Sequence, residues 1–185
     1  MPELPQEIWK DRVENEIKGL KKLKVLEDDS VVSADDSIEM IINIKAFGFI
    51  KEKGDLIPQK SHRIFLKLNR SFPYPGGIDF SWYSNIYHPN IHPVEIKSEQ
   101  PGTGYICLNV LKKWSRLSDL ETTVKALKML VEHPNPEDPL NYDVCLDATE
   151  FFKENSIDDL KTQYKEEIVN IEDDDIEDDI IILDD

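Results

Sequence analysis

Three apolar runs between residues 37 and 83 constrain the possible folds more than any other feature of the chain. In residues 37–47 and 62–69, apolar side chains alternate with polar ones or run on together, which is typical of β-strands with a buried face. A third strand is expected over residues 78–83, after a stiff proline-rich turn at 72–77. Because the connections are short, consecutive strands are expected to pair as an antiparallel meander.

A lysine-rich segment before these runs has the pattern of an amphipathic helix. Over residues 7–25 four apolar side chains fall close to one stripe, and basic side chains cover the other side. The apolar positions are Ile8, Val13, Ile17 and Leu20. Because this is the most basic stretch of an acidic chain, its polar face is either an ordinary solvated surface or a docking surface for a partner.

The segment after the third strand and its irregular continuation predicts further helices. Residues 118–121 have the spacing of a capping box, and the almost wholly apolar run behind them predicts a buried helix that ends at His133. Two shorter helices are expected at about 141–153 and 156–168. A helix, three or four strands, an irregular segment and then helices together predict an α+β fold.

Charge divides the chain into a body and a tail. The 185 residues fit one domain, expected over residues 1–168, and 39% of them are hydrophobic, as in globular proteins. The net charge is −16; residues 169–185 carry nine acids and no base, so −7 remains on the body. The tail is expected to be a disordered acidic arm. Because an acidic surface repels phosphates, basic protein surfaces are expected as partners and nucleic acid is not.

The sequence predicts no membrane partner and no signal peptide. No apolar run approaches the roughly 18 residues that cross a bilayer. The N-terminus, Met-Pro-Glu-Leu-Pro, lacks the basic start and the apolar core of a secretory signal. A cytoplasmic or nuclear protein is therefore expected.

The two cysteines require separate interpretation. Cys107 and Cys145 have no metal-ligand spacing, and a disulfide between them is not expected in a reducing compartment. Cys145 lies at helical spacing from Ala148 and Phe152 and is interpreted as a core residue. Cys107 lies between an isoleucine and a leucine, a setting that alone favours a buried structural cysteine. It follows a rigid turn at residues 88–90, however, and a loop rich in glycine and proline.

The motifs around Cys107 resemble those of the ubiquitin-conjugating enzyme family. In the family's order they are Phe72-Pro73-Tyr74-Pro75, His88-Pro89-Asn90, Ile106-Cys107-Leu108-Asn109-Val110-Leu111, Trp114 and Pro134-Asn135-Pro136-Glu137-Asp138-Pro139-Leu140. The resemblance covers about residues 7–168 and is specific because the motifs occur in combination. It implies the family's fold, in which an N-terminal helix, a four-stranded antiparallel meander and C-terminal helices follow one another.

The resemblance also implies a chemistry. Cys107 would accept ubiquitin or a ubiquitin-like modifier as a thioester from an activating enzyme, and the chain itself would need no cofactor because that enzyme uses the ATP. Asn90 would stabilise the oxyanion that forms when a substrate lysine attacks, or order the nearby loop. Asp138 would orient and desolvate the lysine amine. His88 would tie the turn to its neighbours.

Partners follow from the same resemblance. The basic first helix would meet the activating enzyme, and Phe72, Tyr74 and the loop at residues 114–116 would meet ligases. The modifier stays open: the sequences around Cys107 and Asp138 look slightly closer to the enzymes that load the cullin-modifying ubiquitin-like protein, and ubiquitin is about as well supported.

One departure from the family pattern lies directly beside the nucleophile. About seven residues usually separate the turn asparagine from the cysteine, whereas here sixteen residues, 91–106, intervene. Surface insertions cost little loop-closure entropy, so the fold is expected to survive. His92, inside the insertion, is interpreted as a plain loop histidine, with an influence on the thiol as the alternative.

Two alternatives to an active conjugating enzyme stay open. A catalytically silent binding module, or cofactor of an active paralogue, would have the same fold, although such variants usually lose the cysteine or the turn that this chain keeps. A cysteine hydrolase would need a general base, and no histidine lies within a few residues of Cys107.

The tail has two interpretations of its own. It is either a solvated arm or the carrier of a binding motif. Residues 180–183, Ile-Ile-Ile-Leu between pairs of aspartates, resemble the acid-flanked apolar motif that adds a strand to SUMO-type modifiers.

Overall fold

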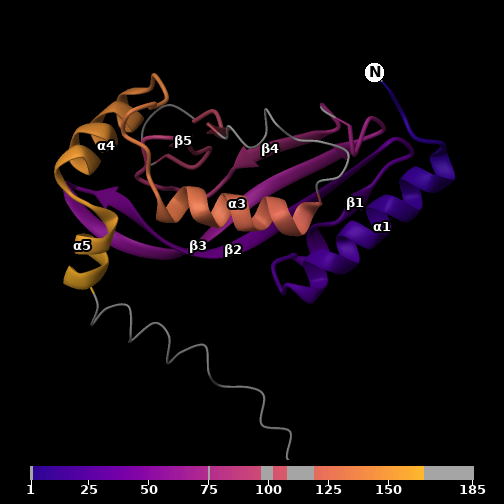
Figure 1. Ribbon diagram of the computed structural model, residues 1–185, viewed down its shortest axis with the longest axis horizontal. Helices are drawn as coiled ribbons and strands as arrows, with labels where there is room; N and C mark the ends of the chain where they lie inside the picture. Colours follow the sequence, from indigo (N-terminus) through magenta and orange to yellow (C-terminus); the bar gives the residue numbers. More distant parts are fainter. Residues whose placement is uncertain (1, 75, 97–101, 108–118, 165–185) are drawn as a thin grey trace, which may run out of the picture.

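The computed structural model describes residues 2–74, 76–96, 102–107 and 119–164. Its elements are α1 (Gln6–Lys22), the 3-10 turn η1 (Asp28–Ser30), β1 (Val32–Ser33), β2 (Ser37–Glu52), β3 (Asp55–Asn69), β4 (Ile78–Trp82), β5 (Ile91–His92), β6 (Tyr105–Ile106), α3 (Leu120–Glu132), α4 (Asp143–Glu154) and α5 (Ile157–Gln163). Figure 1 shows α3 lying along one face of the sheet, with α1 at one end of it and α4 and α5 at the other. The predicted α+β fold is confirmed.

The four main strands form the expected antiparallel meander in the order β1-β2-β3-β4. β3 begins earlier than predicted, at Asp55, because β2 and β3 pair all the way to the turn that joins them. The two turn residues, Lys53 and Gly54, both have positive φ, at 52° and 96°. A two-residue turn of this kind matches the twist of the strands. The pairing therefore continues through residues 48–52 and 55–59, beyond the ends of the two predicted strands.

The helices bury one face each against the sheet. In α1 the buried residues include Trp9, Val13 and Leu20, whereas Ile8 is 55% exposed, so the predicted stripe is wrong at its first position. α3 buries Leu120, Leu127 and other residues of one face. Met129 on α3 is 62% exposed, and the expectation that this helix is buried all round is therefore wrong.

A buried carboxylate joins α1 to α3. Glu16 of α1 accepts a hydrogen bond from the backbone N–H of Leu120 at 2.7 Å, and it forms an ion pair with Arg12 at 2.6 Å. Burial raises the pKa of the Glu16 carboxyl, although these two contacts oppose the rise. The N-cap of α3 is Asp119, which accepts from the N–H of Thr122. The predicted capping box began at Ser118, which lies outside the described residues, so the cap lies one residue later than predicted.

α4 and α5 close the other end of the sheet. α4 packs Ala148 and Phe152 against the aromatic end of β2, where Phe47 and Phe49 are buried. α5 begins at the N-cap Ser156, whose hydroxyl accepts from the N–H of Asp159. The predicted continuation to residue 168, and the whole acidic tail, lie outside the described residues. No helix in the described ranges is both long and apolar enough to cross a bilayer.

Candidate active site

The long insertion between Asn90 and Cys107 is closed at its base by a short hairpin. β5 and β6 pair antiparallel, with Ile91 opposite Ile106 and His92 opposite Tyr105. At the base of this ladder the backbone N–H of Cys107 donates to the carbonyl of Asn90 at 2.9 Å. The insertion therefore leaves Asn90 and Cys107 side by side.

Side-chain alternation along the hairpin decides what shares a face with Cys107. Ile91 is completely buried in the main core and Ile106 packs against it. Because successive side chains of a strand point to opposite faces, Cys107, His92 and Tyr105 lie on the other face. On that face Cys107 is half-buried and Tyr105 is 61% exposed. A partner can therefore approach the thiol beside an exposed aromatic ring.

The side-chain amide of Asn90 is committed to the segment that contains Asp138. Its Nδ2 donates to the carbonyls of Asn135 and Asp138, each at 2.9 Å, and its Oδ1 accepts from the N–H of Asn135 at 2.8 Å. Both amide hydrogens are thus used. This geometry fits the loop-ordering role that the resemblance implied for Asn90; donation to an oxyanion requires one of these bonds to open.

His88 fixes the turn in the manner expected of it. Its Nε2 donates to the carbonyl of Leu130, and its Nδ1 accepts from the backbone N–H of Asn90, each at 3.0 Å. An acceptor at Nδ1 requires the neutral ring with its hydrogen on Nε2. Burial lowers the pKa of His88 to about 3, so the ring stays neutral near pH 7.

Asp138 is brought to the same place through its backbone. Its carbonyl accepts from Asn90, and two residues later the N–H of Leu140 donates to the carbonyl of Pro89 at 2.9 Å. The Asp138 residue itself is exposed to solvent. Cys107, Asn90 and Asp138, which lie far apart in the sequence, are therefore gathered around one turn.

Cys145 faces the opposite environment. It is completely buried, and its Sγ donates to the carbonyl of Ile91 at 3.3 Å, behind the hairpin. Burial raises the pKa of the Cys145 thiol to about 12, which leaves almost no thiolate at neutral pH. The prediction that Cys145 belongs to the core is confirmed, and both cysteines are free thiols.

His92 is a packed strand residue, so its interpretation as a plain loop histidine is wrong. Only 8% of it is exposed, and burial lowers its pKa. Its Nδ1 accepts from the backbone N–H of Thr103 at 3.2 Å and lies 2.7 Å from the Thr103 hydroxyl. Its ring stacks on Tyr142, with centroids 3.8 Å apart and planes 6° from parallel. Sequence reasoning missed Tyr142, whose only signal is an aromatic ring at the expected start of a helix.

Val94 and Gly104 of the insertion are hydrogen-bonded to the last residue of β4. The N–H of Trp82 donates to the carbonyl of Gly104, and the N–H of Val94 donates to the carbonyl of Trp82. Gly104 has φ +74°, and a Cβ there would lie 2.0 Å from the Ser81 hydroxyl oxygen. Doubling a loop costs about 0.6 kcal/mol of closure entropy, which a stacked aromatic pair worth roughly 0.5–1.5 kcal/mol offsets. These contacts tie the described part of the insertion, residues 91–96 and 102–106, to β4 and to Tyr142.

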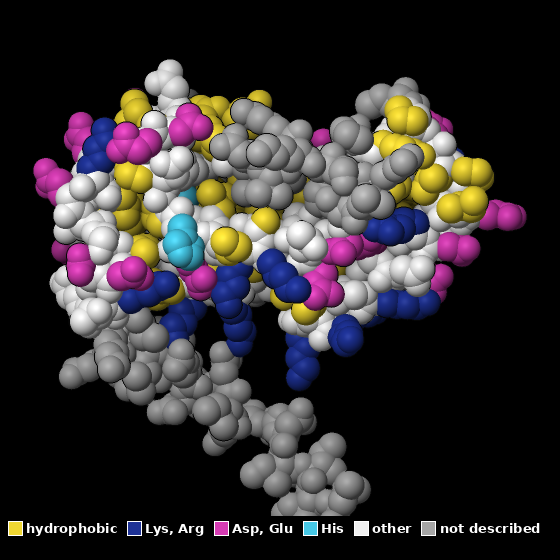
Figure 2. Space-filling model, viewed as in Figure 1, with side chains coloured by type: hydrophobic (Ala, Val, Ile, Leu, Met, Phe, Trp, Pro, Cys, Tyr) yellow, Lys and Arg dark blue, Asp and Glu magenta, His cyan; other side chains and the backbone are white. Residues whose placement is uncertain are grey.

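The surfaces that the sequence predicts to meet partners differ in their exposure. Phe72 is completely buried, with the Arg12 guanidinium 5.9 Å from its ring centroid, so the expectation that Phe72 meets ligases is wrong. Tyr74 is half-buried, and the loop at residues 114–116 lies outside the described residues. Basic side chains gather along the lower edge of the face in Figure 2, below α3 and at the C-terminal end of α1, where Lys21 and Lys22 form the last turn.

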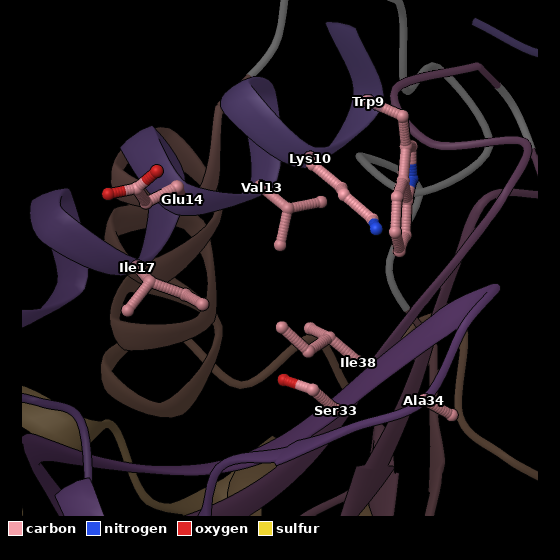
Figure 3. Close-up of a pocket in the computed structure, with 8 residues that line it drawn as sticks. All are labelled: Trp9, Lys10, Val13, Glu14, Ile17, Ser33, Ala34 and Ile38. Carbon is pink, nitrogen blue, oxygen red and sulfur yellow. The ribbon is translucent and has the colours of Figure 1, made fainter. Parts of the chain in front are cut away.

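An apolar groove lies between α1 and the β1 end of the sheet, away from α4. Its volume is about 320 Å³, and Figure 3 shows side chains from both elements pointing into it. The lining residues are Trp9, Lys10, Val13, Glu14, Ile17, Ser33, Ala34 and Ile38. The groove is lined by α1 and the β1–β2 end of the sheet, and no residue of the β5–β6 hairpin lines it.

Comparisons with known proteins agree with this arrangement. The family model described as "Ubiquitin-conjugating enzyme" matches residues 12–158. The chain is 30% identical to Protein PEROXIN-4 of Arabidopsis thaliana over 71% of this chain and 77% of that protein. It is 41% identical to Ubiquitin-conjugating enzyme E2 N of Drosophila melanogaster, but over only 34% of this chain and 36% of that protein.

Two further matches complete the comparison. NEDD8-conjugating enzyme UBC12 of Eremothecium gossypii is 46% identical over 31% of this chain and 27% of its own length. The E2 domain of a Toxoplasma gondii ubiquitin conjugating enzyme superposes with a TM-score of 0.55 at 22% identity, covering 83% of this chain and 92% of that domain, which shows the shared fold. The family model and the relative matched over most of its length show that the chain belongs to the ubiquitin-conjugating enzyme family.

Proposed function

We propose that this chain is an active conjugating enzyme that carries ubiquitin or a ubiquitin-like modifier as a thioester on Cys107. The observation that carries the proposal is the hydrogen bond from the Cys107 N–H to the Asn90 carbonyl, which keeps the two residues adjacent in spite of the insertion. A silent binding module has no need to keep a half-exposed cysteine beside this turn. That reading is the second candidate.

The proposed reaction has two transfers. The Cys107 thiolate attacks the thioester carbonyl on the activating enzyme; the new C–S bond forms, the old one breaks, and the departing thiolate takes up a proton. A substrate lysine amine then attacks the carbonyl, loses a proton and expels the Cys107 thiolate, leaving an isopeptide bond. The exposed carboxylate of Asp138 attracts the incoming ammonium, and Asn90 holds the Asp138 segment against the turn.

Partners are proposed on chemical grounds. The groove beside Trp9, together with the basic end of α1, offers the activating enzyme an apolar pocket and positive charge. The names of the relatives include ubiquitin and NEDD8 as cargo and do not choose between them for this chain. A reducing compartment, the cytoplasm or nucleus, suits a catalytic thiol that must stay unoxidised.

A charging assay tests the proposal. The protein is incubated with ATP, an activating enzyme and each modifier in turn, and the products are separated with and without reductant. We expect an adduct that reductant removes, that is lost in Cys107→Ala, survives in Cys145→Ala and becomes a reductant-resistant ester in Cys107→Ser. If no pair of modifier and activating enzyme charges the protein, the binding-module function replaces this one.

Asn90 is tested in the discharge step. Because its side chain orders the segment from Asn135 to Asp138, Asn90→Ala is expected to charge normally and to transfer its modifier to lysine about tenfold or more slowly. Single-turnover discharge to free lysine measures this. Equal rates of discharge from Asn90→Ala and from the unmodified protein would show that Asn90 has no role in this step.

A further inference from the structure

The hairpin that carries Cys107 is too short to be stable by itself. β5 and β6 contribute two residues each, and two-stranded ribbons are marginal in water even when longer. Sixteen residues, about nine more than the family's usual seven, separate Asn90 from Cys107, so no short loop links these two residues closely. Something outside the hairpin must therefore hold its base in register.

The stacked rings of His92 and Tyr142 provide this contact from outside the hairpin. His92 is the β5 partner of Tyr105, which lies on β6 two residues before Cys107. The Nδ1 of His92 also receives the N–H of Thr103, so one ring contacts both arms of the insertion's base. A displacement of His92 would therefore displace β6, which ends directly before Cys107.

Tyr142 is anchored independently of the hairpin. Its backbone N–H donates to the carbonyl of Leu140, whose own N–H donates to Pro89 in the turn, and its carbonyl accepts from the N–H groups of Cys145 and Leu146 at the start of α4. The Tyr142 ring therefore belongs to a segment that is hydrogen-bonded both to the turn that contains Asn90 and to the first turn of α4. The stack connects this segment to β5 and, through the pairing of β5 with β6, to the residues that precede Cys107.

We propose that His92 and Tyr142 are positioning residues that clamp Cys107 against Asn90 and the Asp138 segment. The side-chain stack does what a short loop would otherwise do, because it fixes the distance between Cys107 and Asn90. Its effect on transfer rests on the proposed function. Its effect on the hydrogen bond from Cys107 to Asn90 does not, and can be measured without any enzymatic activity.

The experiment compares Tyr142→Leu, which removes the ring, with Tyr142→Phe, which keeps it. The first readout is hydrogen exchange at the Cys107 amide. The second is single-turnover discharge at varied lysine concentration, analysed as kcat and KM. Loss of a stacked aromatic pair predicts about threefold to tenfold faster amide exchange in Tyr142→Leu, and a kcat lowered by a similar factor with KM unchanged. Tyr142→Phe is expected to restore both values.

Two further variants keep the test decisive. Tyr83→Leu removes a partly exposed tyrosine whose ring packs near Arg63, and it is expected to leave both readouts unchanged. His92→Asn keeps an acceptor for Thr103 and loses the ring, and it is expected to match Tyr142→Leu, with the double variant no worse than either single one. Unchanged Cys107 exchange in both single variants, or equal losses in Tyr142→Phe, would overturn the clamp. A protein that no modifier charges would defeat the proposed function, and the exchange data would still decide the clamp.

Discussion

The two cysteines bond to the backbone carbonyls of two consecutive residues, Asn90 and Ile91, and yet occupy opposite chemical environments. Cys107 bonds through its backbone to the carbonyl of Asn90 and keeps its thiol half-exposed, whereas Cys145 uses its thiol to reach the carbonyl of Ile91 from inside the core. The hairpin therefore separates a thiol that partners can reach from one that they cannot. The difference in burial, and not the residue type, determines which of the two thiols can react.

The largest expected difference is in reactivity toward a thiol reagent. With a pKa of about 12, about one Cys145 side chain in 10⁴ is a thiolate at pH 8, against about a quarter of an ordinary accessible cysteine. Cys145 should therefore react with iodoacetamide at least about 1000-fold more slowly than free cysteine, while Cys107 is labelled readily. Peptide mapping over time measures both sites. Equal labelling of the two in the folded protein would break the comparison; labelling of Cys145 only in denaturant is the matched control.

A smaller effect is expected from pH, which tests the buried histidines near the site. Burial lowers the pKa of His62 to about 4 and that of His88 to about 3, whereas the unfolded chain titrates near 6.5. The unfolded state therefore binds more protons below pH 6.5, and stability present above that pH is lost as the pH falls toward 4 and then 3. From pH 7 to 5.5 the two residues together should lower the free energy of unfolding by about 2 kcal/mol.

Urea unfolding at both pH values measures the loss, and the NMR signals of the imidazole rings test its cause. Both rings should show no titration between pH 7.5 and 5.5. A midpoint near 6.5 for His88 would show that its ring is accessible and that the turn beside Asn90 is looser than its hydrogen bonds indicate.

The smallest expected effect distinguishes the cysteines by packing alone. Cys145→Ala removes a completely buried sulfur and should lower the free energy of unfolding by about 1–2 kcal/mol, whereas Cys107→Ala, at a half-exposed position, should change it by less than about 0.5 kcal/mol. Chemical denaturation followed by circular dichroism compares the two. A larger loss for Cys107→Ala would mean that this residue supports the fold.

Much of the fold could be predicted because the spacing of apolar residues and the residues that favour turns and helix caps act locally. The alternation in residues 62–69 and the cap at Ser156 each specify an element without reference to the rest of the chain. Errors arose where tertiary contacts decide: Trp9 replaces Ile8 in the core because it packs at the sheet end and donates its indole N–H to the carbonyl of Asn69. Local patterns could not supply that contact.

The candidate site likewise has one part that local motifs predict and one part that only the fold shows. Motifs predict Cys107, Asn90 and Asp138 as site residues, and the structure shows the hydrogen bonds that bring these three residues together. The stack of His92 on Tyr142 joins residues that are fifty positions apart and has no signature in either neighbourhood. An insertion that seemed to separate the site residues contains the contacts that close its own base, and only the fold could show this.

The central claim is that Cys107, and not Cys145, carries the modifier. The most direct measurement is peptide mapping of the charged protein after acid quenching, before any reductant is added. We expect a thioester to the modifier's C-terminus on the peptide that contains Cys107, with Cys145 unmodified. A modifier attached through Cys145, or only through lysine in protein that retains a free Cys107, would contradict it.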